Sequence, residues 1–161
     1  MVTSSPMAEI NSLFEHSDLS VKTSSEIGSE GELIAQDYLF RHNFTVVCCN
    51  FKTPVGRNRK GVVVNGEIDL IAYEDDILCF VEVKTRKSDD FASPLSAVDL
   101  RKQRQIIRTA KRYRKVFHLD GVKFRYDAIG IVLNDKKAPK IEYIRDFFGE
   151  AKFQKNIWWE E

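Results

Sequence analysis

The sequence has few cysteines, no long apolar run and no leader of basic residues followed by an apolar core. Its three cysteines, the adjacent Cys48 and Cys49 and the distant Cys79, match neither a disulfide framework nor the spacing of a zinc site. We therefore expect buried, reduced thiols and a cytoplasmic protein. Membrane spans need about 20 consecutive apolar residues, and no stretch approaches that length. A membrane partner and a secretory signal are not expected.

The overall charge balance hides a local excess of basic residues. The 161 residues are 43% hydrophobic and 30% charged with a net charge of +1, which is typical of one soluble globular domain. Eight basic and no acidic residues lie between Arg101 and Lys115, which leaves the rest of the chain acidic. Such an asymmetry indicates a polyanion partner for one face, although most charge runs are only solvated surfaces.

Apolar periodicity predicts two helices and five strands in the order α, β, β, β, α, β, β. The order contains no repeat and no linker, so we expect one α/β domain over residues 27–148 with a mixed central sheet flanked by helices. The expected helices cover residues 28–44 and 94–116, and the expected strands cover residues 44–49, 67–73, 77–84, 123–133 and 140–144.

Three other segments lack this periodicity. Residues 1–26 are rich in serine and are expected to form a flexible N-terminal tail. Residues 52–64 contain proline, glycine and basic residues and are expected to form a basic, flexible loop. Residues 149–161 form an aromatic C-terminal tail, which either packs on the domain or covers a partner in a homodimer.

Two short, apolar strands carry charges at alternate positions. Strand alternation places Glu67 and Asp69 on one face of the first strand, and Glu82 and Lys84 on one face of the second. A buried charge must be paired or must coordinate a ligand. One interpretation is an ion pair at a sheet edge, with Lys84 bonded to Asp69 or to Glu82. The other is an oxygen site for Mg²⁺ beside a lysine, suited to phosphodiester hydrolysis.

Placed on a helix, the basic residues between Arg101 and Lys115 do not spread evenly around it. At about 100° per residue, most of its cations fall within one stripe, opposite Ile106 and Ala110. Lys102 falls outside that stripe and is expected to point toward the sheet. The stripe is a candidate nucleic-acid-binding surface and consists of Arg101, Arg104, Arg108, Lys111, Arg112 and Lys115.

The spacing of Asp69 from the run Glu82-Val83-Lys84 resembles the signature of the PD-(D/E)xK nuclease superfamily. A wider set of motifs resembles the YraN-like family of predicted endonucleases. These motifs are GSEGELIAQDYL from residue 28, GEIDLI from residue 66, FVEVKTR from residue 80, and the later RYD and IRDFF runs. The resemblance implies a restriction-endonuclease-like fold and Mg²⁺- or Mn²⁺-dependent cleavage of DNA.

The same resemblance assigns roles to individual residues. Asp69 and Glu82 would be metal ligands, and the backbone carbonyl of Val83 an extra one. Lys84 would be the catalytic lysine. Glu32, on the first helix, would complete the acidic cluster, a role that helical geometry alone would equally allow for Glu30.

Three further residues have two interpretations each. Glu67 is either a supporting residue behind the metal ligands or a solvated carboxylate. Lys102 and Gln103 either approach the catalytic centre, as in related nucleases, or only cap the helix start. Arg125 and Asp127 are expected to pair with each other on one strand face.

The sequence therefore predicts a metal-dependent endonuclease that acts on DNA, with branched or structured DNA among the candidate substrates and RNA left open. The alternative from another class is a non-catalytic nucleic-acid-binding module that retains the nuclease fold. A metal-dependent phosphatase would leave the basic stripe without a use. A homodimer would supply two sites for a symmetric cut.

Overall fold

A computed structural model describes residues 22–88, 93–134 and 137–153. The expected tail up to residue 21 and the last residues of the aromatic tail, from residue 154, lie outside the described residues. None of the described helices is long and apolar enough to cross a membrane.

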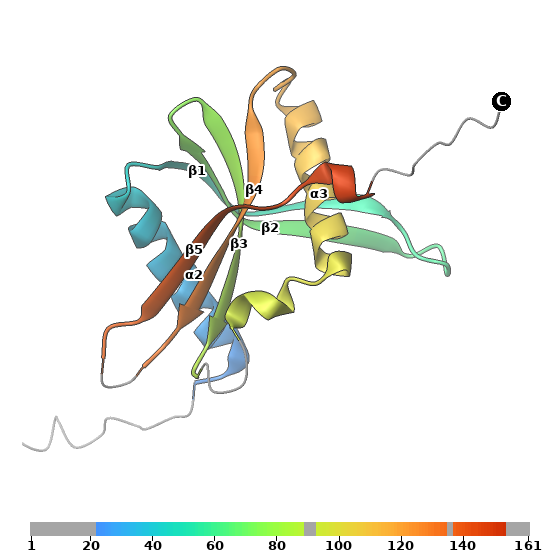
Figure 1. Ribbon diagram of the computed structural model, residues 1–161. Helices are drawn as coiled ribbons and strands as arrows, with labels where there is room; N and C mark the ends of the chain where they lie inside the picture. Colours follow the sequence, from blue (N-terminus) through green and yellow to red (C-terminus); the bar gives the residue numbers. More distant parts are fainter. Residues whose placement is uncertain (1–21, 89–92, 135–136, 154–161) are drawn as a thin grey trace, which may run out of the picture.

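Five strands form one mixed sheet in the order β1-β2-β3-β4-β5 (Figure 1). Only β3 and β4 are parallel, and the other neighbouring pairs are antiparallel. This confirms the expected α/β fold with a mixed sheet flanked by helices, consistent with a restriction-endonuclease-like fold. The strands are β1 (Thr45–Arg57), β2 (Val63–Glu74), β3 (Ile77–Arg86), β4 (Phe124–Val132) and β5 (Lys140–Phe148).

The first helix, α2 (Ser24–Arg41), begins ahead of the start predicted at residue 28. Thr23 and Glu26 form a capping box, in which the Thr23 hydroxyl accepts from the Glu26 N–H and the Glu26 carboxylate accepts from the Thr23 N–H. This reciprocal pairing fixes the first turn inside the expected tail. The helix ends before residue 44 because Asn43 adopts a φ of 63°, which turns the chain toward β1.

The helix predicted over residues 94–116 consists of two separate helical segments. A single 3₁₀ turn, η1 (Pro94–Ala97), precedes α3 (Leu100–Val116). Asp99 begins the new helix, since its carboxylate accepts from the Lys102 N–H at 2.8 Å. The prediction of one continuous helix from residue 94 was therefore wrong at its start, where a strong N-cap residue interrupts the pattern.

Two apolar clusters pack on opposite faces of the sheet. Because side chains alternate along β3, Phe80 packs toward α3 while Val81 and Val83 pack toward α2. The cluster on the α3 side includes Ile71, Phe80, Ile106, Tyr113 and Tyr126. The cluster on the α2 side includes Leu39, Leu70, Val81, Ile129 and Ile131.

The segment expected to be a flexible loop, residues 52–64, is mainly strand. β1 continues to Arg57 and β2 begins at Val63, so only residues 58–62 connect them. Edge strands tolerate proline and bulges, and β1 has an irregularity next to Pro54. The side chain of Asn58 closes the turn by accepting from two backbone N–H groups. We call residues 52–66 the arm, because this hairpin projects past α3 (Figure 1).

The cysteines are less buried than expected. Cys79 is buried, but Cys48 is only partly buried and Cys49 is exposed. Both lie on the edge strand β1, where only one neighbouring strand covers the backbone and side chains reach solvent. The expectation of three buried thiols was therefore wrong for this pair.

The last described residues belong to the domain rather than to a separate tail. Phe148 ends β5 and is buried, and Phe147 and Phe153 pack against the cluster on the α3 side. Phe153 belongs to a short 3₁₀ turn, η2 (Glu150–Phe153). This part of the aromatic segment packs back on the domain.

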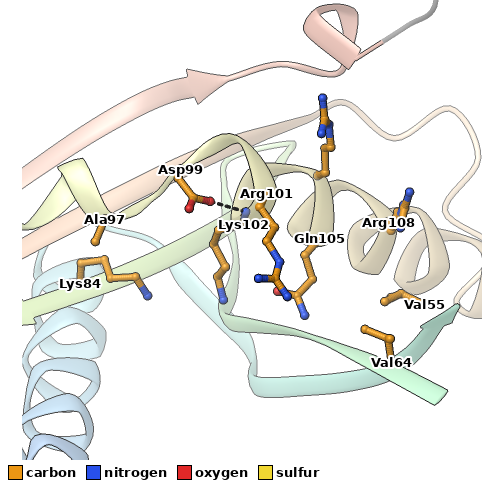
Figure 2. A pocket seen from close by; sticks show the side chains of 10 residues that line it. Val55, Val64, Lys84, Ala97, Asp99, Arg101, Lys102, Gln105 and Arg108 are labelled. Atoms are coloured by element: carbon orange, nitrogen blue, oxygen red, sulfur yellow. Dashed lines mark hydrogen bonds between the residues drawn. The ribbon is translucent and has the colours of Figure 1, made fainter. Parts of the chain in front are cut away.

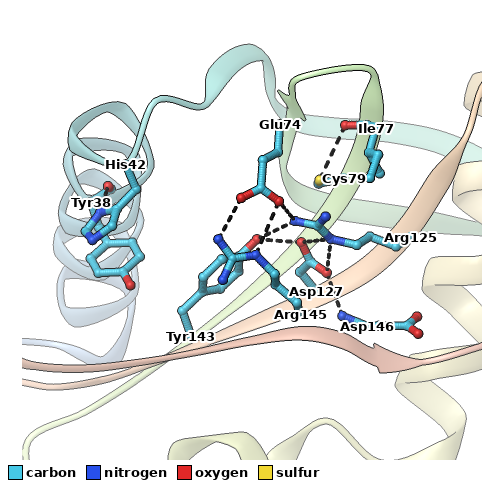
Figure 3. A network of polar contacts seen from close by, with 10 residues as sticks. All are labelled: Tyr38, His42, Glu74, Ile77, Cys79, Arg125, Asp127, Tyr143, Arg145 and Asp146. Atoms are coloured by element: carbon cyan, nitrogen blue, oxygen red, sulfur yellow. Dashed lines mark hydrogen bonds and ion pairs between the residues drawn. The ribbon is translucent and has the colours of Figure 1, made fainter.

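A polar network lies where β4 and β5 meet (Figure 3). Asp127 is fully buried, and its carboxylate accepts from Arg125, from the Tyr143 hydroxyl and from the Asp146 N–H. The predicted pairing of Arg125 with Asp127 is confirmed, with two contacts of 2.9 Å. Among the described residues, a guanidinium, a hydroxyl and a backbone N–H all donate to this one carboxylate, which is typical of a structural role.

The same network makes stability depend on pH at the acid end. A hydrogen bond from Arg145 is the main cause that lowers the pKa of Glu74 to about 2; partial burial opposes it and a hydrogen bond from Arg125 adds to it. A lowered pKa stabilises the fold above the ordinary value of about 4.5, and this contribution is lost as the pH falls toward 2. We expect the melting temperature of Glu74→Gln to fall less steeply over this range than that of the wild type. Asp75→Asn, on the adjacent exposed residue, should follow the wild type.

Candidate functional site

The site begins where β2 and β3 separate. Their pairing ends at Leu70 and Val81. Beyond that point β3 continues beside β4 to Arg86, and the other half of β2 continues beside β1. In the described sheet, the edge of β3 from Glu82 onward therefore faces a gap instead of a strand.

The side chain of Asp69 fills this gap. Its carboxylate oxygen Oδ2 accepts from the Val83 N–H at 2.7 Å and replaces the strand carbonyl that the amide would otherwise need. Asp69 is only 8% exposed. The N–H and C=O of one strand residue point to the same edge, so the Val83 carbonyl is directed toward the same gap.

Glu82 lies beside this gap on the α3 face, because it alternates with Val81 and Val83 along β3. It is only 1% exposed. Its Oε1 accepts from Lys84 Nζ at 2.5 Å and lies 3.0 Å from Lys102 Nζ. The ion pair with Lys84 was one of the two sequence interpretations, and Lys102 points inward as its place on the helix predicts.

Burial and the neighbouring charges affect the protonation of Asp69. Burial is the main cause that raises the pKa of Asp69 to about 7, and the charge of Glu82 raises it further. The hydrogen bond from Val83 and the charges of both lysines act in the opposite direction. Burial alone would lower the pKa of Lys84, but its ion pair with Glu82 raises the net value. Lys84 is therefore a stable cation, while Asp69 can exchange its proton near neutral pH.

The donor set fits a hard divalent cation. Glu82 Oε2 is buried and has no hydrogen-bond partner among the described residues, and a buried oxygen of this kind is costly unless something binds it. Mg²⁺ is commonly held by one or two carboxylates together with water and phosphate oxygens. Asp69, Glu82 and the Val83 carbonyl supply such a set. In the described ranges, no three or more His, Cys, Asp or Glu side chains form a group arranged to hold a metal.

The structure does not bring the two other predicted carboxylates into contact with this pair. Glu32, on α2, accepts from Asn50 Nδ2 at 3.0 Å, although it lies near enough to contribute to the raised pKa of Lys84. Glu67 forms an ion pair with Lys52 of β1 at 3.2 Å and is partly exposed. Their proposed roles at the site stay predictions.

Gln103 is buried at the start of α3. Its side-chain Nε2 donates to the Val98 carbonyl at 2.9 Å, and its Oε1 has no hydrogen-bond partner within residues 22–88, 93–134 and 137–153. Gln103 therefore ties α3 to the preceding turn. Lys102, and not Gln103, contacts the buried carboxylate.

All six residues of the predicted basic stripe are exposed on α3. Two of them have partners that the sequence did not suggest, because the partners come from η2, far along the chain. The Arg104 guanidinium lies over the ring of Phe153 at 5.2 Å from its centre, and Lys111 pairs with Glu150 at 3.0 Å. Glu150 also pairs with Arg114, which lies off the stripe.

A cavity of about 510 Å³ lies between the first half of α3 and the arm (Figure 2). The side chains of Lys84 and Lys102 contact the buried Glu82 carboxylate and also line this cavity. The sequence did not predict that Val55 and Val64 line this cavity, because residues 52–64 were expected to form a flexible loop. The lining comprises Val55, Val64, Lys84, Ala97, Asp99, Arg101, Lys102, Arg104, Gln105 and Arg108.

Comparison with known proteins identifies the family. Residues 31–131 match the model of the uncharacterised protein family UPF0102. The chain is 36% identical over 128 residues to a UPF0102 protein of Clostridium botulinum (strain Eklund 17B / Type B), covering 79% of this chain and 97% of that protein. The chain belongs to the UPF0102 family. The resemblance to the YraN-like group is thereby confirmed.

A second UPF0102 protein and one solved structure are also similar to this chain. A UPF0102 protein of Solibacter usitatus (strain Ellin6076) is 38% identical over 121 residues, covering 75% of this chain and 84% of that protein. The crystal structure of SSO0001 aligns with a TM-score of 0.37 at 18% identity, over 81% of this chain and 56% of that one. The matched family region contains both buried carboxylates, both lysines and the whole basic stripe.

Removing the charge of Asp69 should stabilise the protein in the absence of metal. The folded-state pKa of Asp69, about 7, exceeds its ordinary value of 3.8, so this group's contribution to stability is greatest at low pH and is lost as the pH rises to about 7. Asp69→Asn keeps an oxygen acceptor for the Val83 N–H without the charge. We expect its melting temperature in EDTA to exceed that of the wild type at pH 8 and to vary less with pH.

The control is Glu67→Gln, which removes a charge from the same strand at a partly exposed position. It should leave the pH dependence unchanged. An Asp69→Asn protein that melts at or below the wild-type temperature at pH 8 would contradict the claim that the charge of Asp69 destabilises the folded protein.

Proposed function

We propose that this UPF0102 protein is a divalent-metal-dependent endonuclease that hydrolyses phosphodiester bonds in DNA, with branched or structured DNA among its substrates. The proposal is supported by one observation above all. Lys84 and Lys102 line the cavity and pair with the buried carboxylate of Glu82, while the buried carboxylate of Asp69 bonds to the next residue of β3, Val83. The rest of the charged lining of the cavity is almost entirely cationic. Carboxylates suit a metal, and arginines suit the phosphates of a polyanion.

The roles follow from the protonation states. Lys84 remains charged because Glu82 raises its pKa; it therefore suits stabilisation of the charge that develops on the phosphate better than proton abstraction. Lys102 neutralises the same carboxylate from α3. Asp69, with a pKa of about 7, can give up its proton when a cation binds.

Mg²⁺ or Mn²⁺ would be held by Asp69, Glu82 and the Val83 carbonyl, and would supply Lewis-acid activation of the scissile phosphate. The surrounding side chains have their own tasks. Asp69 keeps the Val83 backbone in place through its hydrogen bond, and the basic stripe positions the DNA backbone.

A non-catalytic binding module is the second candidate. The observation in its favour is that Lys84 and Lys102 already compensate the charge of Glu82 without a metal. A binding protein, however, has no need for a second buried carboxylate, Asp69, whose charged form is destabilised by burial.

Replacement of Lys84 separates the two functions. If Lys84 acts in the transition state, Lys84→Ala should cut cleavage of DNA in Mg²⁺ by about 10²–10³-fold while DNA affinity in EDTA changes little. The control is Lys87→Ala, the same change at an exposed position just after β3, which should cleave as the wild type does. Cleavage assays with junction, flap and linear DNA give the measurement. A wild-type protein that binds DNA but cuts none of these substrates would favour the binding module.

The basic stripe should contribute salt-dependent affinity for duplex DNA. If Arg104, Arg108 and Arg112 each neutralise one phosphate, their joint replacement by Gln should flatten the slope of log affinity against log salt by about 2.7. The loss should be similar for different base sequences, since phosphate contacts carry no sequence information.

The control removes the same charge elsewhere, by the triple change Lys22→Gln, Arg41→Gln and Lys123→Gln at exposed positions off α3. Its salt slope should match that of the wild type. Equal slopes for both triple variants would show that the stripe does not contact phosphates.

A further inference from the structure

The arm is fixed to α3 by two contacts that the proposed chemistry does not require. Gln105 Nε2 donates to the Asn65 carbonyl at 2.8 Å. Gly66 packs so closely on Thr109 that a Cβ atom at this position would lie 2.0 Å from the Thr109 hydroxyl oxygen. Thr109 is itself held by a hydrogen bond to the Gln105 carbonyl. The distance between the arm and the first half of α3 is therefore set by packing.

The cavity between these two elements is cationic on one side and apolar on the other. Lys84, Lys102 and three arginines of the stripe line it, together with Val55 and Val64 of the arm. Among the described residues that line it, the one carboxylate is that of Asp99, which already caps α3. In the described part of the chain, no ion pair links Arg101 or Arg108 to a carboxylate. Figure 2 shows Lys84 at one end of the cavity and the two valines at the other.

The dimensions exclude a double helix from this space. A volume of 510 Å³ corresponds to a cube with an edge of about 8 Å, whereas the major groove alone of duplex DNA is about 12 Å wide. A cavity of this size is typical of sites that bind small organic molecules. The individual nucleotides of a single strand are of that size. A duplex can lie along the outer stripe, but only an unpaired strand can enter the cavity and reach Lys84.

We propose that this cavity binds one unpaired strand of DNA and directs its phosphates toward Lys84. The inference deepens the proposed nuclease function and rests on it for the outcome of binding. Arg101 and Arg108 contact phosphates of this strand, while Val55 and Val64 pack against sugars and bases. The side-chain Nε2 of Gln105 is bonded to the arm, and stacking and phosphate contacts carry no sequence information, so binding is tolerant of sequence.

The substrate class follows from the two surfaces together. The exposed stripe accepts a duplex along the outside of α3, and the cavity accepts a single strand that leaves this duplex. The structure therefore favours DNA in which a duplex joins an unpaired strand, such as a flap or a splayed junction.

Two pairs of matched variants test the cavity. Arg108 and Arg112 are both exposed arginines one turn apart on α3, but only Arg108 lines the cavity. Val64 and Val62 are both exposed on the arm, but only Val64 lines it. None of the four side chains lies in the core, so each change should leave the fold intact, and circular dichroism checks this.

Binding is measured by fluorescence anisotropy in EDTA, with a short oligo-dT and a blunt duplex of equal length as probes. Arg108→Gln should flatten the salt slope for oligo-dT by about 0.7, and Arg112→Gln should not. Val64→Asp places a carboxylate beside the phosphates and should weaken oligo-dT binding about tenfold or more, whereas Val62→Asp should not. Equal effects within either pair would overturn the proposal, as would a wild-type protein that does not bind oligo-dT. Tighter binding of an oligo-U of the same length would overturn the assignment to DNA.

The binding assay contains no metal, so its outcome is independent of cleavage. A protein that cuts blunt duplex but shows no difference within the variant pairs is a nuclease without a single-strand site, and the inference fails alone. The predicted flatter salt slope of Arg108→Gln and weaker oligo-dT binding of Val64→Asp, in a protein that cuts no DNA with Mg²⁺, support the cavity and contradict the nuclease function.

Discussion

The hydrogen bond from the Val83 N–H to the Asp69 carboxylate joins two strands at the point where they part. Without the Asp69 carboxylate, the buried N–H of Val83 would have no acceptor at the edge of β3 that lacks a neighbouring strand. The gap between the strands would then close or fill with water. The gap in turn makes room for Glu82 and for the lysines that reach it from β3 and α3. It also sends the first half of β2 away from the sheet, and this is what places the arm beside α3. Strand divergence, the acidic pair and the cavity therefore have one common origin.

The charges of this site balance only partly. Two lysines compensate the single oxygen Oε1 of Glu82, while its Oε2 and the strained carboxylate of Asp69 remain without equivalent compensation. The Asp127 network shows the contrast. Asp127 lies on the neighbouring strand β4, in register with Val81, and its carboxylate is matched by donors from arginine, tyrosine and backbone. A domain that can satisfy one buried carboxylate fully, and leaves another unsatisfied, retains the second at a cost to stability. Functional sites are where such costs commonly occur.

The sequence was informative where a pattern is local and repeated. Alternation along β2 and β3 predicted that Asp69, Glu82 and Lys84 would meet, and helical spacing predicted that Lys102 would point inward. It was misleading at residues 52–64, since Pro54 and the glycines are typical of loops but are equally tolerated at the edge of a sheet. The contacts of Arg104 and Lys111 with η2 depend on tertiary packing between distant segments and have no local signal. The start of α2 could have been found, because Thr23 and Glu26 have the spacing of a capping box.

Pro54 has a consequence beyond the hairpin in which it lies. β1 is an edge strand, and edge strands can add a strand from another molecule through their free backbone groups. A proline without an N–H, the irregularity beside it, and the charges of Lys52 and Arg57 make the outer edge of the arm a poor template for such pairing. The arm can therefore project from the domain and still resist self-association. A two-fold assembly of this chain, if it pairs strands between subunits, is better served by the opposite edge of the sheet at β5.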